Sequence, residues 1–303
     1  MHLNNGQFFK TLTIGTFDGV HIGHQKILEK VVTLSKLNGF IPSVLTFFPH
    51  PRMVLHQDKT IKLLNTISER KLLLEQFGIE LICVKTFTKE FSNLSAEDYV
   101  KGILIDELNA KQIVIGYDHH FGKNRSANIN DLKKFAEEFD FKIEEISAED
   151  IQNVTVSSTK IRNALFNGNV TLANTYLGYN YVLTGKVIKG HKIGRTLNFP
   201  TANIYIEEDY KLIPKDGVYV VKAIIKDFYY YGMMNIGSNP TIENKPHSIE
   251  VHFFDFNEEI YGHEIKIEML KRLRDERKFD SIDLLRKQLN KDKKEALDYI
   301  QSI

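Results

Sequence analysis

Two histidines beside glycines are the first residues in the chain that could do chemistry. They lie in TIGTFDGVHIGHQKIL, residues 13–28, where an apolar run is followed by a tight polar stretch. The candidate phosphate-binding residues of this stretch are Gly15, Phe17, Asp18, His21, Gly23 and His24. A helix that begins near Gly23 would direct free N–H groups and its positive dipole end at an anion. The histidines add donors that can become cationic as phosphate charge builds up. The stretch therefore predicts a phosphate site.

Two simpler explanations of this stretch remain. One is a turn with two solvated histidines. The other is a zinc pair, although no third Cys or His lies nearby at metal-ligand spacing.

A second glycine-containing loop lies in GKVIKGHKIGRTLNFPTANI, residues 185–204. Gly190 and Gly194 allow the backbone to come close to phosphate, and Pro200 stiffens the entry to the TAN segment. Thr201 and Asn203 are neutral oxygen donors that suit Mg²⁺ or its waters. The segment favours a nucleotide loop, and its alternative is a plain β-turn.

A third candidate is VSSTKIR, residues 156–162. Ser157, Ser158 and Thr159 can cap the following helix and offer hydroxyl groups. Arg162 is a forked cation that suits phosphate oxygens. The alternative is a capped helix with a surface arginine.

The elements that must position these residues change in character along the chain. From Lys10 to about Ile146, apolar strands alternate with amphipathic helices, with Ser68 and Ser95 as candidate helix caps and Gly78 as a stop. This alternation predicts a parallel sheet covered on both faces, in which ligands bind beyond the carboxyl ends of the strands. The histidine motif follows the first strand and falls at that edge.

The second half reads as β-structure. From about Tyr181, strands follow one another without long helices, and one final helix can be capped by Asp280 or Ser281. This pattern predicts an antiparallel barrel or sandwich. A helical connector precedes it, so we expect domains at residues 1–183 and 184–303.

Composition limits the partners. The chain has 303 residues, a net charge of +1 and a pI of about 7.8, which does not favour nucleic acid as a bulk partner. Cys83, the single cysteine, lies in an apolar run and is expected to be a buried thiol, with no disulfide within the chain. We find no signal-peptide core and no apolar stretch of membrane-spanning length, which points to the cytoplasm and away from a membrane partner. The oligomeric state stays open, with a weak homo-oligomer as one option.

The first half resembles the HxGH nucleotidyltransferases. GTFDGVHIGH resembles their signature GxFDGxHxGH, and VSSTKIR resembles their second signature, [IV]SSTxIR. In that superfamily a phosphate attacks the α-phosphate of a nucleoside triphosphate and expels pyrophosphate. The resemblance implies that His21 and His24 stabilise the transition state and that Ser158, Thr159 and Arg162 contact ATP.

Two further segments resemble elements of the flavin branch of that superfamily. TFFPHP (residues 46–51) and IGYDHHFG (residues 115–122) are similar to TFxPHP and GxDFxFG. This resemblance implies that His50, Pro51 and Asp118 help to shape the adenine and flavin pockets. His119 replaces a phenylalanine of the pattern, and Ala127 replaces a glycine.

The second half resembles riboflavin kinases. Residues 185–204 are similar to GxxxGRxLGFPTAN, with Asn198 in place of one glycine. MNIGSNPT, IEVHFFDF and LKRLRDERKFDS are similar to further strings of those kinases. The resemblance implies that Glu250 is the catalytic base and that Gly190, Gly194 and Arg195 belong to a phosphate loop. It also implies that Thr201 and Asn203 hold Mg·ATP and that Asn235 and Arg274 contact the flavin.

Taken together, the motifs resemble the bacterial bifunctional riboflavin kinase/FAD synthetase family in order and total length. This implies conversion of riboflavin to FMN and of FMN to FAD with ATP and Mg²⁺. Three alternatives stay open. Only one half could be active; the acceptor could be pantetheine phosphate, nicotinamide mononucleotide or a glycerol phosphate; or the chain could be a flavin- or RNA-binding regulator.

Overall fold

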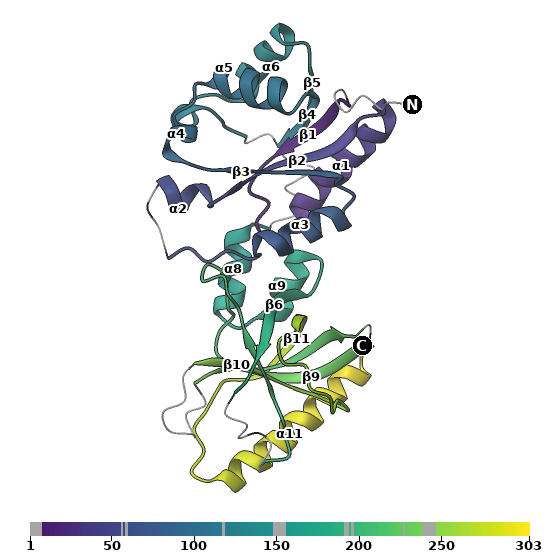
Figure 1. Cartoon of the computed structure of the whole chain (residues 1–303), viewed down its shortest axis with the longest axis vertical. Coiled ribbons are helices and arrows are strands. Elements are labelled where there is room, and N and C mark those ends of the chain that lie inside the picture. Colours follow the sequence, from purple (N-terminus) through teal and green to yellow (C-terminus); the bar gives the residue numbers. More distant parts are fainter. Residues whose placement is uncertain are drawn as a thin grey trace. The chain divides into compact units, whose positions relative to one another are not determined.

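The structure is a computed structural model. It describes residues 8–55, 57, 60–116, 119–147, 156–190, 194, 197–226, 228–238 and 247–303. The chain divides into two compact units, Met1–Ser157 and Ser158–Ile303, which are described one at a time (Figure 1).

The first unit contains a five-stranded parallel sheet, as the alternating pattern predicts. Its strands are β1 (Lys10–Ile14), β2 (Ile41–Phe48), β3 (Leu81–Thr86), β4 (Ala110–Gly116) and β5 (Lys142–Ile146). Their order in the sheet is β3-β2-β1-β4-β5. The central strand β1 pairs with β2 on one side and β4 on the other. The histidine motif therefore leaves the middle of the carboxyl edge, at the point where the strand order reverses.

Helices and short turns connect these strands. They are α1 (Ile22–Asn38), α2 (Pro51–Leu55), α3 (Ile67–Gln76), α4 (Lys89–Ser92), α5 (Ala96–Asp98), the π-helix η1 (Tyr99–Glu107), the 3₁₀ turn η2 (Lys123–Arg125) and α6 (Ile129–Glu138). The predicted Ser95 cap is confirmed, because its side chain accepts the Asp98 N–H. The predicted Ser68 cap is wrong. Thr66 caps α3 in a reciprocal box with Glu69, because Thr66 has the extended backbone that a cap needs.

The second unit begins with two helices and closes into a barrel. The helices are α8 (Ser158–Phe166) and α9 (Val170–Leu177). The strands are β6 (Tyr181–Ile188), β7 (Ala202–Tyr205), β8 (Gly217–Ile225), β9 (Phe228–Gly237), β10 (Ser248–Phe253) and β11 (Glu264–Arg274). They form a closed antiparallel barrel in the order β10-β7-β6-β11-β8-β9, which decides between barrel and sandwich. The predicted boundary between residues 183 and 184 falls inside β6 and stays a prediction.

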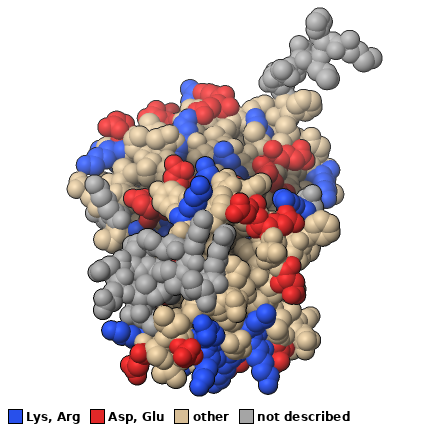
Figure 2. All heavy atoms as spheres, turned by 60° about the horizontal axis from the view of Figure 1, so that its bottom comes forward, with Lys and Arg blue, Asp and Glu red and all other residues tan. Residues whose placement is uncertain are grey.

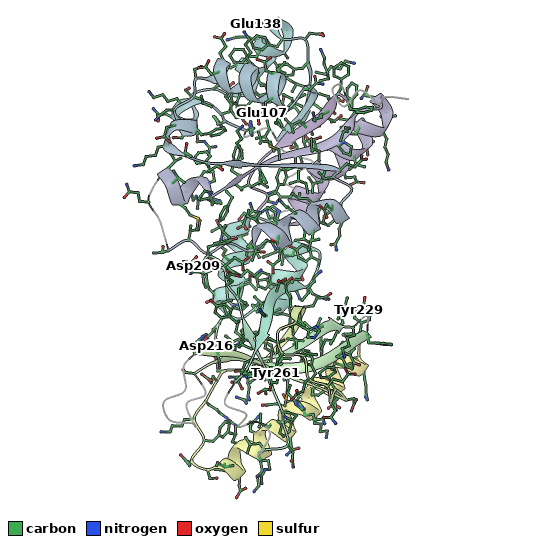
Figure 3. The ribbon with its side chains drawn as sticks, in the orientation of Figure 1. Glu107, Glu138, Asp209, Asp216, Tyr229 and Tyr261 are labelled. Carbon is green, nitrogen blue, oxygen red and sulfur yellow. The ribbon has the colours of Figure 1, made fainter. Side chains whose placement is uncertain are left out.

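The last helix, α11 (Ile282–Gln301), covers part of this barrel. Ser281 rather than Asp280 caps it, accepting the Leu284 N–H. Buried Ala296 packs into a core cluster with Val220 and Met233, so α11 shares the core of the β8–β9 hairpin. The hairpin end exposes Tyr229 to solvent (Figure 3).

Charged side chains of both signs cover the surface, and the single thiol is partly buried. Acidic and basic side chains are interspersed over much of the face in Figure 2, and Lys and Arg gather at its lower end. Cys83 is half-buried against the first unit's core rather than fully buried, because it lies on the edge strand β3. Within the described part of the chain, no helix has the length and apolar character to cross a membrane.

Candidate active sites

The histidine motif forms the entrance to α1. His21 is the N-cap of α1, and its Nδ1 accepts the backbone N–H of His24 at 3.4 Å. The two imidazole rings stack with centroids 3.7 Å apart. Because Nδ1 of His21 accepts, the neutral ring carries its proton on Nε2. A Cβ added at Gly23 would lie 3.3 Å from the His21 ring, which is a tight contact, so glycine at this position leaves room for the ring.

Burial sets the charge of His24. Burial, with His21 and Arg70 nearby, lowers the pKa of His24 well below its ordinary value. Before a ligand arrives, His24 is therefore neutral. A polyphosphate at this position would favour the protonated ring, because a nearby opposite charge raises the pKa of a base.

Asp18 fixes the position of the histidine motif through buried contacts. It is 1% exposed, its carboxylate accepts the Leu64 N–H at 3.0 Å, and Arg70 lies 3.5 Å away. The neighbouring Gly19 N–H donates to Asn65 Oδ1 at 2.8 Å. These bonds tie the loop after β1 to the segment before α3, so Asp18 acts on the structure of the site. Its predicted contact with ATP stays a prediction.

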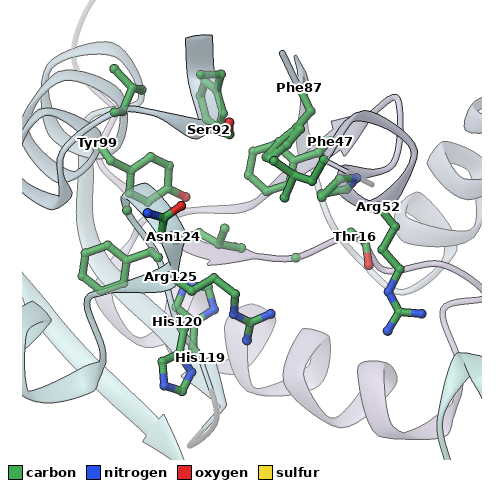
Figure 4. A pocket seen from close by; sticks show the side chains of 18 residues that line it. Thr16, Phe47, Arg52, Phe87, Ser92, Tyr99, His119, His120, Asn124 and Arg125 are labelled. Carbon is green, nitrogen blue, oxygen red and sulfur yellow. The ribbon is translucent and has the colours of Figure 1, made fainter. Parts of the chain in front are cut away.

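A cavity of about 570 Å³ lies beside this edge of the sheet (Figure 4). It has an aromatic side, where Phe47, Phe87 and Tyr99 lie, and a side with nitrogen-rich groups. The latter are His119, His120 and Arg125, with Arg52 farther along the rim. An aromatic wall suits a planar ring system, and cations suit a phosphate.

Some predicted residues line this cavity and others do not. Gly15 and Pro51 are part of its wall. The ring of His50 accepts the Arg52 N–H at 3.2 Å and so starts α2. Asp118 lies outside the described residues. The aromatic wall was missed at the level of sequence, because its members come from separate segments with no shared motif.

The two departures near this cavity have physical explanations. Ala127 forms a two-way backbone bridge with Phe121, at 3.0 and 3.1 Å, which is a conformation open to any residue. The His119 ring stacks on Phe121 with centroids 6.1 Å apart. His119 thus supplies a flat aromatic face where the pattern has phenylalanine.

The second signature, residues 156–162, straddles the division between the two units. Ser158, Thr159 and Arg162 belong to α8 and hence to the unit that contains the barrel. Because the two units are described separately, their predicted contacts with the ATP of the first unit stay predictions.

The barrel brings its predicted residues together around one carboxylate. Thr201 Oγ1 donates to Glu250 Oε2 at 3.2 Å, and Ser248 Oγ donates to Glu250 Oε1 at 3.3 Å. On the strands beside it, Glu250 pairs with Asn203 of β7 and Asn235 of β9. The result is a carboxylate flanked by neutral oxygen and amide groups.

The two glycines of the kinase-like loop leave room for neighbouring groups, a side chain in one case and a backbone carbonyl in the other. A Cβ at Gly190 would lie 2.2 Å from Asn203 Nδ2, and a Cβ at Gly194 would lie 2.2 Å from the Phe199 carbonyl oxygen. Asn198 has φ +63°, a left-handed conformation that glycine adopts freely and that asparagine tolerates. This explains how Asn198 replaces glycine. Arg195 lies outside the described residues.

A cleft of about 630 Å³ adjoins this loop. Asn198, Pro200 and Thr201 line it together with Phe253 and Tyr261, the latter labelled in Figure 3. Its size and aromatic lining suit a purine nucleotide.

The remaining flavin candidates are tied to the chain itself. Arg274 makes a two-pronged ion pair with buried Asp292 of α11, with atoms 2.7–3.0 Å apart. Asn235 Nδ2 donates to Glu276 Oε1 at 3.3 Å. Glu276 was not singled out from sequence, although the LKRLRDERKFDS string contains it. The flavin roles of Arg274 and Asn235 stay predictions.

The donor set of the barrel suits magnesium. Thr201 and Asn203 offer neutral oxygens, and Mg²⁺ is commonly held by few protein groups together with substrate phosphates and waters. Within the described ranges, no three His, Cys, Asp or Glu side chains form a cluster that could hold a metal ion.

Comparison with known proteins follows the same division. A family model for FAD synthetase matches residues 7–160, and one for riboflavin kinase matches residues 177–300. The bifunctional riboflavin kinase/FMN adenylyltransferase of Bacillus subtilis is 41% identical over 301 residues, which cover 96% of this chain and 93% of the relative. The Escherichia coli protein of the same name is 31% identical and covers 95% and 92%.

A solved structure shares the whole fold. A crystal structure described as a macrolide-efflux protein from Streptococcus pneumoniae has a TM-score of 0.84 and 33% identity. The match covers 96% of this chain and 95% of that one.

Proposed function

The chain belongs to the family of bifunctional riboflavin kinase/FMN adenylyltransferases, and we propose that the two reactions are divided between the barrel and the parallel-sheet unit. The barrel phosphorylates riboflavin to FMN. The parallel-sheet unit joins FMN to AMP from a second ATP, giving FAD and pyrophosphate. The observation that carries the proposal is the Glu250 carboxylate, hydrogen-bonded to Thr201 and paired with Asn203 beside a nucleotide-sized cleft.

In the kinase reaction, Glu250 accepts the proton of the riboflavin 5′-hydroxyl as that oxygen attacks the γ-phosphorus of ATP, the bond from the γ-phosphorus to the β,γ-bridging oxygen breaks, and ADP leaves. A carboxylate on a strand that is hydrogen-bonded to both neighbours suits this role, because its backbone is held rigidly and keeps the carboxylate in position for the hydroxyl. Thr201 and Asn203 hold Mg·ATP, and the loop containing Gly190 and Gly194 encloses the phosphates. Magnesium, when bound, neutralises charge on the phosphate oxygens.

In the adenylyl transfer, a phosphate oxygen of FMN attacks the α-phosphorus of ATP and pyrophosphate leaves. His21 and His24 donate N–H groups to the phosphates at the entrance of α1, and Arg162 adds a positive charge. The FMN ring lies against the aromatic wall of Phe47, Phe87 and Tyr99. Arg125 and His119 face its phosphate tail. Positioning and electrostatics therefore supply the catalysis.

Retention of both activities is supported at each departure from the family pattern. Asn198 adopts the conformation of the glycine it replaces, and Ala127 occupies a backbone bridge that tolerates a methyl group. His119 keeps an aromatic face toward Phe121. We retain the cytoplasm as the expected location. A weak homo-oligomer stays open.

Two variants test the division of labour. Glu250→Gln is expected to lower FMN formation about 10²–10⁴-fold, as loss of a general base does, and to leave FMN-to-FAD conversion unchanged. Exposed Glu264 of β11 provides the matched control, Glu264→Gln. The assay incubates the protein with riboflavin or FMN, ATP and Mg²⁺ and separates the flavins. Equal loss of both reactions would contradict the role of Glu250.

His24→Ala is expected to do the reverse, with FAD synthesis lost and FMN formation retained. His263→Ala, at an exposed histidine of the barrel unit, is its control. Near-normal FAD synthesis in His24→Ala would remove this residue from the catalytic group.

The boundary between the activities is a proposal of its own. We propose that residues 1–183 and 184–303 fold separately. Fragments cut at residues 157/158, where the compact units divide, are the comparison. If only the latter pair folds, α8 and α9 belong to the kinase unit and the 183/184 boundary is wrong.

A further inference from the structure

His252 follows the proposed base by two residues on β10. Because side chains alternate along a strand, Glu250 and His252 project from the same face. Glu250 accepts a hydrogen bond from Thr201, and His252 Nδ1 lies 2.8 Å from the carbonyl oxygen of Pro200. Two side chains of one strand therefore hold two consecutive residues of the neighbouring segment.

The partner of His252 decides where its proton lies. A carbonyl oxygen can only accept, so Nδ1 must carry the hydrogen and donate it. Burial lowers the pKa of His252; the bond to Pro200 opposes this shift and Lys293 adds to it. The ring is therefore neutral at neutral pH, with its single N–H committed to Pro200.

The His252 ring is packed against aromatic neighbours. It lies edge-on to Phe199 and Phe254, with centroids 5.1 and 5.8 Å away, and the residue is 9% exposed. Phe199 is anchored in turn, because its N–H donates to the Gly194 carbonyl at 2.9 Å. His252 thus packs against two aromatic rings and directs its donor at the carbonyl of Pro200, the residue before Thr201.

We propose that His252 is a positioning residue for the phosphoryl transfer, which fixes the Pro200 carbonyl and thereby sets Thr201 at its distance from Glu250. The proposal rests on the roles proposed above for Glu250 and Thr201. His252 does not touch the reacting atoms. It acts through the backbone of Pro200, so its loss should affect turnover in the barrel and leave the other reaction alone.

The test compares a variant that lacks the hydrogen-bond donor with one that retains it. His252→Leu removes the N–H and puts an apolar side chain in place of the ring. His252→Asn retains a donor at the δ position, where Nδ1 now lies. His263→Leu is the control for a His→Leu change, because His263 is exposed and its backbone N–H and C=O make hydrogen bonds that the substitution keeps. For each full-length variant we would measure the melting temperature, kcat and KM for FMN formation, and the rate of FAD formation from FMN.

His252→Leu is expected to lower kcat for FMN formation about tenfold to hundredfold, the cost of a catalytic group displaced by about 1 Å. His252→Asn is expected to restore kcat to within about threefold of the parent, as a single retained hydrogen bond allows. FAD formation should not change in any variant.

Two outcomes would overturn the proposal. One is a His252→Leu protein that is folded and has parental kcat. The other is an equal loss in the Leu and Asn variants, which would mean that ring packing matters and the N–H does not. If His252→Leu fails to fold, His252→Asn is compared with His252→Gln, whose donor lies one bond farther out; equal activities overturn it. Glu250→Gln, assayed alongside, separates this failure from failure of the proposed base, because only the latter leaves Glu250→Gln active.

Discussion

The space above Gly190 is filled by the side-chain amide of Asn203, and a single methyl group would test whether that amide matters. In Gly190→Ala the new Cβ would lie 2.2 Å from Nδ2, 2.5 Å from Cγ and 2.8 Å from Oδ1 of Asn203. Non-bonded heavy atoms rest about 3.5–4.0 Å apart, so the amide must move by about 1 Å or more. The Gly190 backbone is outside the left-handed region, so backbone strain does not add to the effect.

Asn203 is proposed to hold Mg·ATP, and a displacement of this size in such a group corresponds to about a hundredfold loss in rate. We therefore expect kcat/KM for MgATP in riboflavin phosphorylation to fall about 10²-fold in Gly190→Ala, with FAD formation from FMN unchanged. Steady-state assays of each reaction at saturating flavin measure this. Gly102→Ala is the control, because a Cβ at Gly102 meets nothing within 4 Å.

A double-mutant cycle identifies the cause. With Asn203→Ala already present, Gly190→Ala has no amide to displace and should cost no more than about threefold, since coupled residues are not additive. Parental kinase activity in Gly190→Ala would refute the reasoning. A full hundredfold loss in the Asn203→Ala background would also refute it, because the loop and not the amide would then be responsible.

Three further predictions concern stability. Asp18→Ala removes the carboxylate that lies beside buried Arg70 and accepts the Leu64 N–H, and it should lower the free energy of unfolding by about 3 kcal/mol in urea denaturation; an unchanged midpoint would mean that these contacts contribute little. Asn198→Gly should be tolerated in a thermal melt, whereas Asn198→Val, a β-branched residue at φ +63°, should cost about 1–2 kcal/mol; equal melting temperatures would contradict this. Burial lowers the pKa values of His24 and His252 in the folded chain. Histidines of the unfolded chain have pKa values of about 6.5, so as the pH falls the unfolded chain takes up protons before the folded chain does. Stability should be full above pH 6.5 and fall as the pH drops below it; urea midpoints at pH 7.5 and 5.5 that agree would rule this out.

Much of the architecture could be predicted because it depends on local patterns. The strand–helix alternation in the first half predicted a parallel sheet, and the apolar strand before Gly15 predicted that the histidine motif leaves its carboxyl edge. Pattern alone did not separate barrel from sandwich. Closure depends on which strands pair. Strand β6 pairs with β11, and Glu264 lies 78 residues after its partner Lys186, a separation that no local sequence window covers.

The wrong choice of Ser68 could have been avoided from the sequence. Ser68 and Thr66 both have the right chemistry for a cap, but only Thr66 is followed three residues later by a glutamate, which is the capping-box spacing. Thr66 wins because its backbone is extended and Glu69 stands three residues on to complete the box. Asp18 shows the limit at longer range: its partners Leu64 and Arg70 come from a segment more than forty residues away.

The candidate motifs could be recognised in the sequence, because a phosphate loop, a capped helix entrance and a strand-borne carboxylate each occupy a few consecutive residues. Which of these motifs lie together depends on the fold. Thr201 reaches Glu250 through the pairing of β7 with β10. The aromatic wall combines Phe47 of β2, Phe87 after β3 and Tyr99 of η1. The physical reason is that burial and strand pairing are properties of the closed chain, so they select among candidates that local sequence leaves equivalent.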